Sequence, residues 1–181
     1  DITRRAVDVL SSADAVVCEE RKNGARLLKE LGIDKPLTEL NEHNESSMLQ
    51  DILVLLMQGQ SLALVSACGT PVFSDPGRQR LGLLNEMNIQ VVPVPGASSL
   101  VAAMSVCPFN LEQFQFAGFL PPKTELRQPA LARLSRADQP VILMDTPYRL
   151  SKLLGEVQQA FGKKQRVFLA CDLTLPSERL Y

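Results

Sequence analysis

Two segments rich in glycine and proline contain the residues best suited to binding a small polar ligand. The first, residues 66–77, reads SACGTPVFSDPG and follows an apolar run typical of a buried strand. Gly69 allows close backbone approach to a ligand, and Pro71 and Pro76 restrict φ on either side of the loop. Such a stiff loop can present N–H and C=O groups in fixed directions, which suits a small polar cofactor. The same composition also fits an ordinary connecting loop.

The second segment, residues 93–99, reads PVPGASS and precedes an apolar stretch with helical spacing. We expect Ser98 or Ser99 to be the N-cap of a helix over 99–106, and a helix N-terminus can hold a carboxylate or a phosphate. A simple capped helix is the alternative. The chain contains neither GxGxxG nor GxxxxGK[ST], so it lacks both the dinucleotide-binding fingerprint and the P-loop.

Residues for acid–base chemistry are few. The pair Glu19-Glu20 could act as paired carboxylates, but such a pair is also typical of a solvated strand end. His43 could be a general base or a solvated loop residue, and Tyr148-Arg149 could orient an anionic or planar substrate or lie on the surface. With a single histidine, the chain is not expected to build a metal site or a Ser-His-Asp triad. No catalytic residue is assigned from the sequence.

The composition limits the classes of protein to which the chain can belong. The chain has 181 residues, 45% of them hydrophobic and 22% charged, which fits one or two small globular domains. Its apolar runs are far shorter than a membrane span, and its first residues do not resemble a signal peptide. The four cysteines form no CxxC pair, and nothing basic adjoins Cys68. We therefore expect buried free thiols in a reducing compartment, the cytoplasm, and no cysteine nucleophile.

The charge is uneven along the chain. The formal net charge is −1, yet residues 1–113 contain 9 Lys and Arg against 14 Asp and Glu, whereas residues 114–181 contain 10 against 6. A basic second half mildly favours a polyanionic partner. Aromatic residues make up only 5% of the chain and tryptophan is absent, which does not favour a base-stacking platform.

Alternating strand and helix patterns predict βαβ units with mostly parallel sheets, in two α/β domains, 1–110 and 111–181. Ligands bind such sheets at the carboxyl ends of the strands, where the loops described above fall. We expect Ser46 or Ser47 to cap the third helix and Pro129 to fall in the first turn of the sixth. The expected helices are 3–11, 25–31, 48–58, 78–87, 99–106, 126–136 and 148–160; the expected strands are 15–18, 61–66, 89–92, 114–118, 141–144 and 167–171.

Taken in order, these segments resemble the tetrapyrrole methylase superfamily of S-adenosylmethionine-dependent methyltransferases. The resemblance covers essentially the whole chain and is strongest to the branch that comprises the ribosomal RNA small subunit methyltransferase I family. It rests on GTP-x₃-DPG (69–77) combined with VPVPG (92–96) and GFLPPK (118–123), together with LLKELGI (27–33), NEHNE (41–45) and ACDLT (170–174).

The resemblance implies a fold, a cofactor and a substrate. Two α/β domains would hold S-adenosylmethionine in the cleft between them, the family's first strand would precede Asp1, and the C-terminal domain would continue past Tyr181. The chain would be a homodimeric cytoplasmic enzyme that methylates a ribose 2′-hydroxyl of 16S rRNA in the small ribosomal subunit. The implied cofactor-binding residues are Gly69, Thr70, Phe73, Ser98, Ser99, Met144 and Ala170. Glu20 and Arg149 are candidate substrate residues because of the side-chain chemistry described above.

The chain departs from the pattern of the RNA branch at charged positions. It has EERK (19–22) where that branch reads EDTR, Ala67-Cys68 in place of Asp-Ala, Asp145-Thr146 in place of Glu-Ser, and CDLTL (171–175) in place of RELTK. These changes leave two alternatives open. One is a methyltransferase acting on a tetrapyrrole precursor or another small molecule. The other is a non-catalytic cofactor-binding paralogue, marked by Ala67, Cys68 and Leu175.

Overall fold

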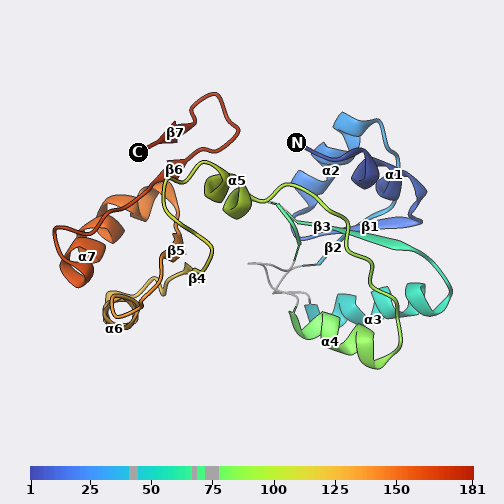
Figure 1. Cartoon of the computed structure of the whole chain (residues 1–181). Coiled ribbons are helices and arrows are strands. Elements are labelled where there is room, and N and C mark those ends of the chain that lie inside the picture. The colour runs from blue at the N-terminus through green and yellow to red at the C-terminus, as the bar shows by residue number, and fades with distance from the viewer. Residues whose placement is uncertain (41–44, 67–68, 72–77) are drawn as a thin grey trace. The chain divides into compact units, whose positions relative to one another are not determined.

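Three short parallel strands form the sheet of the N-terminal part of the chain (Figure 1). They are β1 (Ala15–Cys18), β2 (Leu37–Glu39) and β3 (Leu62–Val65), in the order β2-β1-β3. The computed structural model describes residues 1–40, 45–66, 69–71 and 78–181. These residues divide into two compact units, Asp1–Ser99 and Leu100–Tyr181.

Helices cover both faces of the first sheet. Residues Val16 and Val17 are both buried, and because side chains alternate along a strand they face opposite sides. Val16 packs with Leu10 of α1 (Arg4–Ser12) and Leu28 of α2 (Arg21–Leu31). Val17 packs with Leu40 and with Ile52 of α3 (Glu45–Met57). The sheet is therefore the middle layer of this unit.

Local signals set the ends of its first two helices. The hydroxyl of Thr3 accepts a hydrogen bond from the Ala6 amide and caps α1. Gly32 ends α2 with a φ of 67°, and the Ile33 amide donates to the carbonyl of Leu28, as expected for a glycine C-cap. Gly32 thus stops this helix as the sequence predicts. The fourth helix, α4 (Arg78–Glu86), is the last of the unit.

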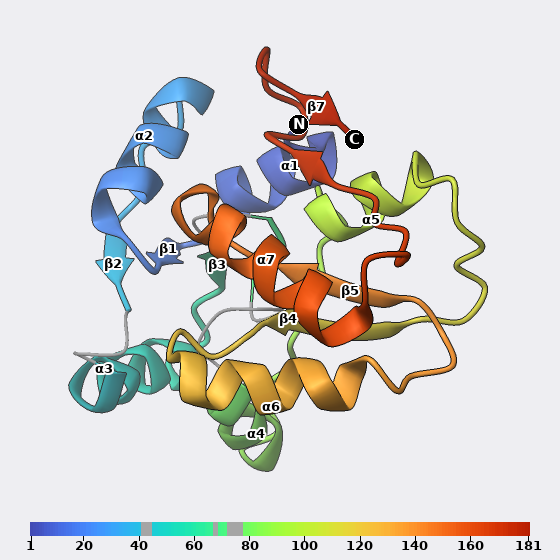
Figure 2. The same ribbon diagram turned by 90° about the vertical axis from the view of Figure 1, so that its left-hand side faces the viewer.

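The second unit contains two small sheets. Strands β4 (Gln115–Phe119) and β5 (Val141–Met144) are parallel, whereas β6 (Ala170–Cys171) and β7 (Arg179–Leu180) form a separate antiparallel pair. Its helices are α5 (Ser99–Ser105), α6 (Thr124–Leu134), the short 3₁₀ turn η1 (Pro147–Arg149) and α7 (Leu150–Phe161). Helices α6 and α7 lie on the same side of the β4–β5 sheet (Figures 1 and 2).

Leucine side chains form the core of the second unit. Leu131 and Leu134 of α6 pack with Leu153 of α7 and with Leu120, which follows β4. Leu131 is 1% exposed. Within the part of the chain that the structure describes, no helix is long and apolar enough to cross a membrane.

Several predicted elements differ from the structure. Residues 89–92 form no strand, because no described strand pairs with them and Val91 and Val92 remain exposed. Only the last two residues of the strand expected over 167–171 are in β6. Helix α3 begins at Glu45, so Ser46 and Ser47 lie inside it and do not cap it. Pro129 is the sixth residue of α6 and not part of its first turn. The domain boundary at residue 110 stays a prediction.

Candidate functional site

The carboxyl ends of all three strands of the first sheet meet at one edge. Cys18 pairs with Glu39 of β2 and with Val65 of β3. Glu19 and Glu20 follow β1 at this edge, and Glu20 is exposed at the N-cap position of α2. Its Oε2 accepts a 2.7 Å hydrogen bond from Asn23 Nδ2. The carboxylate of Glu20, a candidate substrate residue, is thus held by a side chain of the helix that it precedes.

The described residues of the two glycine- and proline-rich segments lie against each other at Gly69, Thr70 and Ala97. Gly69 has a φ of 81°, and a Cβ added there would lie 3.5 Å from the carbonyl oxygen of Ala97. The hydroxyl of Thr70 donates to the same carbonyl oxygen at 3.5 Å. The Thr3 hydroxyl donates to the carbonyl of Pro95 at 3.1 Å. Two side-chain hydroxyls therefore fasten residues 95–97 to other parts of this unit.

This arrangement leaves residues of both segments accessible, and for Gly69 and Gly96 the exposed surface is main chain. Gly69, Thr70, Gly96 and Ala97 are all exposed. Exposed N–H and C=O groups on fastened loops can hold a polar ligand without a charged counter-ion, because they are already oriented before it binds. Ser98 is half-buried directly before α5, and Ser99 is the first residue of that helix.

Some residues singled out in the sequence lie outside the described residues. These are Phe73, the histidine of the NEHNE motif, Ala67 and Cys68. The other three cysteines are free; Cys18 is buried, whereas Cys107 and Cys171 are half-buried. Burial raises the pKa of the Cys18 thiol, and the neighbouring Glu39 carboxylate raises it further. Cys18 is thus held as a neutral thiol in the core.

In the second unit, a β-bulge redirects the chain at the end of β4. Phe116 pairs with Ile142 and Gly118 with Leu143, so one extra residue is inserted in β4. Gly118 has a φ of 60°, a conformation that glycine adopts without a Cβ penalty. The loop that follows, residues 120–123, is called here the diproline loop. Its Leu120 is anchored in the leucine core.

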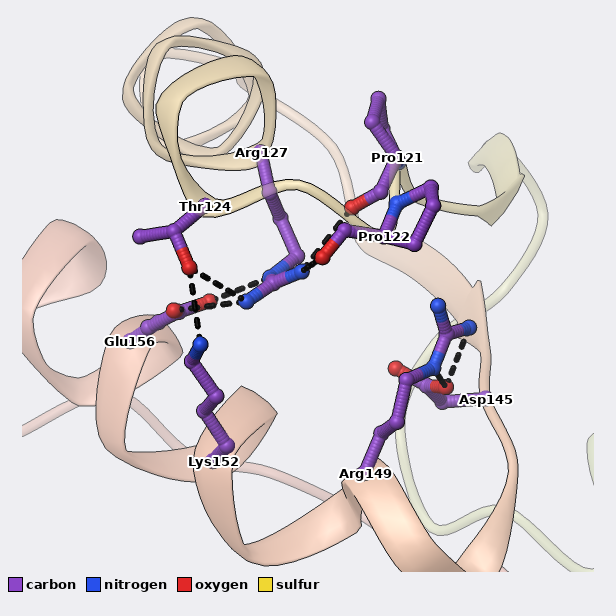
Figure 3. Close-up of polar contacts among 8 residues, drawn as sticks. All are labelled: Pro121, Pro122, Thr124, Arg127, Asp145, Arg149, Lys152 and Glu156. Carbon is purple, nitrogen blue, oxygen red and sulfur yellow. Dashed lines mark hydrogen bonds and ion pairs between the residues drawn. The ribbon is translucent and has the colours of Figure 1, made fainter.

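The diproline loop is fastened by the guanidinium of Arg127 (Figure 3). Nη1 donates to the carbonyl oxygens of Pro121 at 3.0 Å and Pro122 at 2.6 Å. Nη2 donates to Thr124 Oγ1 at 3.3 Å and to Glu156 Oε1 at 2.8 Å, and Nε donates to Glu156 Oε2. All five N–H donors of the guanidinium are thereby used.

The Arg127–Glu156 pair joins α6 to α7 in a buried position. The two side chains are 5% and 9% exposed. Hydrogen bonding to Arg127 lowers the pKa of the Glu156 carboxyl, against the opposing effect of burial. Hydrogen bonding to Glu156 raises the pKa of Arg127 in turn. Both groups are therefore ionised at neutral pH.

A second ion pair occupies the carboxyl end of β5. Asp145 Oδ1 accepts hydrogen bonds from Arg149 Nε and from the Thr146 amide, each at 2.7 Å. The Arg149 side chain is 24% exposed. Arg149, a candidate substrate residue, is thus paired with a carboxylate of its own loop, while Tyr148 beside it is 85% exposed.

The implied cofactor residues of the second unit belong to different sheets. Met144 is the last residue of β5 and pairs with Phe119, so it lies at the same strand end as the start of the diproline loop. Ala170 is in β6 and pairs with Leu180 of β7. The described strand pairing therefore does not bring Met144 and Ala170 together in one ladder.

Sequence reasoning assigned no fastening role to four residues that hold these loops, namely Thr3, Arg127, Asp145 and Glu156. One signal was available for Arg127. Two consecutive prolines have no N–H to donate, so a loop that contains them can form backbone hydrogen bonds there only through its carbonyls. Arginine is the side chain with the most donors for such carbonyls, and Arg127 is nearby in the sequence. Its partner Glu156 is 29 residues away in sequence and gave no such signal.

Comparison with known proteins identifies relatives along the whole chain. A family model described as tetrapyrrole (corrin/porphyrin) methylases matches residues 1–181. A ribosomal RNA small subunit methyltransferase I of Synechocystis sp. is 35% identical over 100% of this chain and 65% of its own length. A protein of the same name from Escherichia coli O157:H7 is 34% identical over 100% of this chain and 63% of its own length. Another, from Neisseria meningitidis serogroup B, is 38% identical over 96% of this chain and 60% of its own length. The chain thus spans less than two thirds of these relatives.

A solved structure shares the fold. It is that of a cobalt precorrin-4 methyltransferase, a cobalamin biosynthetic enzyme, with a TM-score of 0.70 at 16% sequence identity. The match covers 99% of this chain and 77% of that one. The mixed α/β fold with parallel sheets expected from the sequence is confirmed.

Proposed function

This chain belongs to the tetrapyrrole (corrin/porphyrin) methylases, and we propose on that premise that it is part of an S-adenosylmethionine-dependent methyltransferase that acts on 16S rRNA. The observation that carries the proposal is the similarity, along the whole chain, to proteins named ribosomal RNA small subunit methyltransferase I. The acceptor we propose is a ribose 2′-hydroxyl, in line with the resemblance found in the sequence.

The geometry of the first unit fits the cofactor. S-adenosylmethionine has an ammonium, a carboxylate and an adenine, all of which backbone N–H and C=O groups can bind. Exposed backbone of this kind is present at Gly69 and Gly96, and their neighbours Thr70 and Ala97 are exposed residues joined by a hydrogen bond. We therefore propose that Gly69, Thr70, Ser98 and Ser99 hold the cofactor. The corresponding roles of Phe73, Met144 and Ala170 stay predictions.

Alignment is the main contribution expected of the protein. When bound, S-adenosylmethionine supplies a methyl group already activated by a positively charged sulfur. The chain then has to hold the acceptor in line with that group and to exclude water, and orientation alone supplies a large part of such a rate enhancement. The hydrogen bonds from Thr3 and Thr70 to carbonyls of residues 95–97 serve this end, since they fix the binding backbone in advance.

The charge distribution supports a nucleic-acid acceptor. Residues 114–181 have an excess of basic residues, although the whole chain has a net charge of −1. A locally positive region attracts a polyanion, whereas a neutral or acidic one does not. The family also includes enzymes of tetrapyrrole synthesis, so a tetrapyrrole precursor is the second candidate acceptor.

Two measurements on the full-length protein test the proposal. Calorimetry with S-adenosylmethionine should show binding at a single site; the absence of binding would favour the non-catalytic paralogue. Incorporation of a labelled methyl group should then be compared between undermethylated 30S subunits and a uroporphyrinogen-type substrate. We expect label in the 16S rRNA, and label in the small molecule alone would contradict the RNA acceptor.

We further propose that the full-length protein is a cytoplasmic homodimer. Helix α5 supports this, because none of its residues is buried and Val101 is 61% exposed. Exposed apolar side chains of this kind are covered in an association between copies. Sedimentation velocity of the full-length protein should show a dimer, and Val101→Glu should shift it toward the monomer. A monomer at all concentrations would contradict the proposal.

A further inference from the structure

Burying the charges of Arg127 and Glu156 costs free energy, and the packing of α6 against α7 does not by itself require that cost. Both side chains are almost fully buried, and all five donors of the guanidinium are satisfied. Removing two charges from water carries a large desolvation cost, and well-packed apolar residues often give equal or greater stability. Unlike an apolar pair, the ion pair provides hydrogen-bond donors for two proline carbonyls.

Those carbonyls need an external donor because of the loop's sequence. Pro121 and Pro122 lack N–H groups, so hydrogen bonds from their own amides cannot fix the diproline loop. Leu120 anchors its start in the core, and the Arg127 guanidinium holds the next two carbonyl oxygens. Glu156 holds the guanidinium with both carboxylate oxygens. Glu156 of α7 thus helps to fix the loop conformation by holding Arg127 of α6.

The residue that this loop presents is Lys123. It is exposed, and the described residues offer its ammonium no hydrogen bond or ion pair. It occupies the N-cap position of α6 without a side-chain capping bond. A cation is unfavourable at this position, because the N-terminal end of a helix is itself electropositive. Helix stability therefore does not account for a lysine here.

The location of Lys123 indicates what it could contact. The diproline loop follows the carboxyl end of β4, which is parallel to β5, and ligands of parallel sheets bind at that end. Lys123 lies in the basic half of the chain. An exposed ammonium to which the described residues offer no hydrogen bond or ion pair suits a phosphate group, because lysine contacts phosphate as a point charge.

We propose that Arg127 is a positioning residue: held by Glu156, it fixes the diproline loop so that Lys123 contacts a backbone phosphate of the RNA acceptor. This inference rests on the proposed function and adds to it a named contact and the residue that places it. Arg127 itself is buried, so its effect on RNA binding acts through the diproline loop and not through contact with the RNA.

The test is a double-mutant cycle in the full-length protein, with affinity for undermethylated 30S subunits measured over a series of salt concentrations. Lys123→Ala should weaken binding and lower the slope of log K against log salt by about 1, as expected for the loss of one phosphate contact. Arg127→Gln should weaken binding to a similar extent. The double variant should bind no more weakly than either single variant, because both changes remove the same contact.

A matched control separates positioning from stability. Leu28→Ala removes a core side chain from α2 in the first unit and should cost about 2–5 kcal/mol of unfolding free energy. Leu28 packs in a different core from Leu120 of the diproline loop, so the effect of this variant on RNA affinity should be small and should add to that of Lys123→Ala. Should Arg127→Gln fail to fold, Glu156→Gln replaces it, and the same coupling to Lys123 is expected.

The outcomes are distinct. Additive effects of Lys123→Ala and Arg127→Gln, or an unchanged salt slope in Lys123→Ala, would overturn the inference. In either case, methylation of 16S rRNA by the unaltered protein would leave the proposed function standing. If the two effects are non-additive but no methyl group is incorporated, the positioning of Lys123 by Arg127 would be supported and the proposed reaction would be contradicted.

Discussion

Gly24 of α2 lies directly against Cys18, the last residue of β1. A Cβ added to this glycine would fall 2.9 Å from both Cβ and Sγ of the cysteine, closer than real Cβ atoms approach. The helix that begins at the carboxyl edge of the first sheet is therefore packed on its strand through a glycine. This contact also helps to bury Cys18, a residue that is 2% exposed.

Gly24→Ala should destabilise the first unit. The new methyl group has to displace either the strand or the helix, and overpacking of this kind costs about 1–3 kcal/mol. Urea unfolding of the full-length protein measures it. Gly82→Ala is the matched control, because that helical glycine has nothing within 4 Å of its Cβ position and should gain roughly 0.5–1 kcal/mol. Equal stabilisation by both changes would show that α2 is not packed as described.

Gly69→Val should abolish or strongly weaken binding of S-adenosylmethionine. Its side chain would point toward the Ala97 carbonyl, between the two proposed binding segments, and its φ of 81° strains a β-branched residue. We expect the calorimetric Kd to rise by at least about tenfold, equivalent to 1.4 kcal/mol. Gly59→Val carries nearly the same strain, with a φ of 82°, but has open space around it and should bind normally. Normal binding by Gly69→Val would show that this loop does not hold the cofactor.

Acid should weaken the fold partly through Glu156. Its pKa is lowered in the folded state by hydrogen bonding to Arg127, so its contribution to stability is present above the ordinary carboxyl pKa and is lost as pH falls through the folded value. Urea unfolding at a series of pH values from neutral to acid measures this loss. Glu156→Gln should be less stable at neutral pH and should lose less stability on acidification. An acid response identical to that of the unaltered protein would contradict the ion pair.

The Cys18 thiol should resist modification at mildly alkaline pH. Burial raises its pKa in the folded state, so the stability that it contributes is present below the ordinary thiol pKa and is lost as pH rises through the folded value. Alkylation followed by mass spectrometry should label the half-buried Cys107 and Cys171 before Cys18, which reacts only on unfolding. Labelling of Cys18 as fast as the others would contradict its burial.

The sequence predicted the order of elements best where apolar periodicity was strong. The strand over 15–18 was predicted at its exact bounds, and the Gly32 helix end was found from glycine alone. The strand predicted over residues 89–92 does not form, because a strand exists only when another strand pairs with it. Four residues of which three are apolar do not show whether such a partner is available. The strand Leu37–Glu39 was missed because its three residues are too few for a pattern.

For the candidate sites, the sequence by itself determined the residue types: the glycines and prolines that stiffen the loops and the family pattern that they form. Only the tertiary structure decided what fastens those loops. Gly69 and Thr70 meet Ala97, and Arg127 meets Glu156, across 27 to 29 residues of chain. Local propensity acts over a few residues, whereas hydrogen bonds between distant segments depend on how helices and strands pack. Such packing is set by the whole unit and cannot be derived from any one of its motifs.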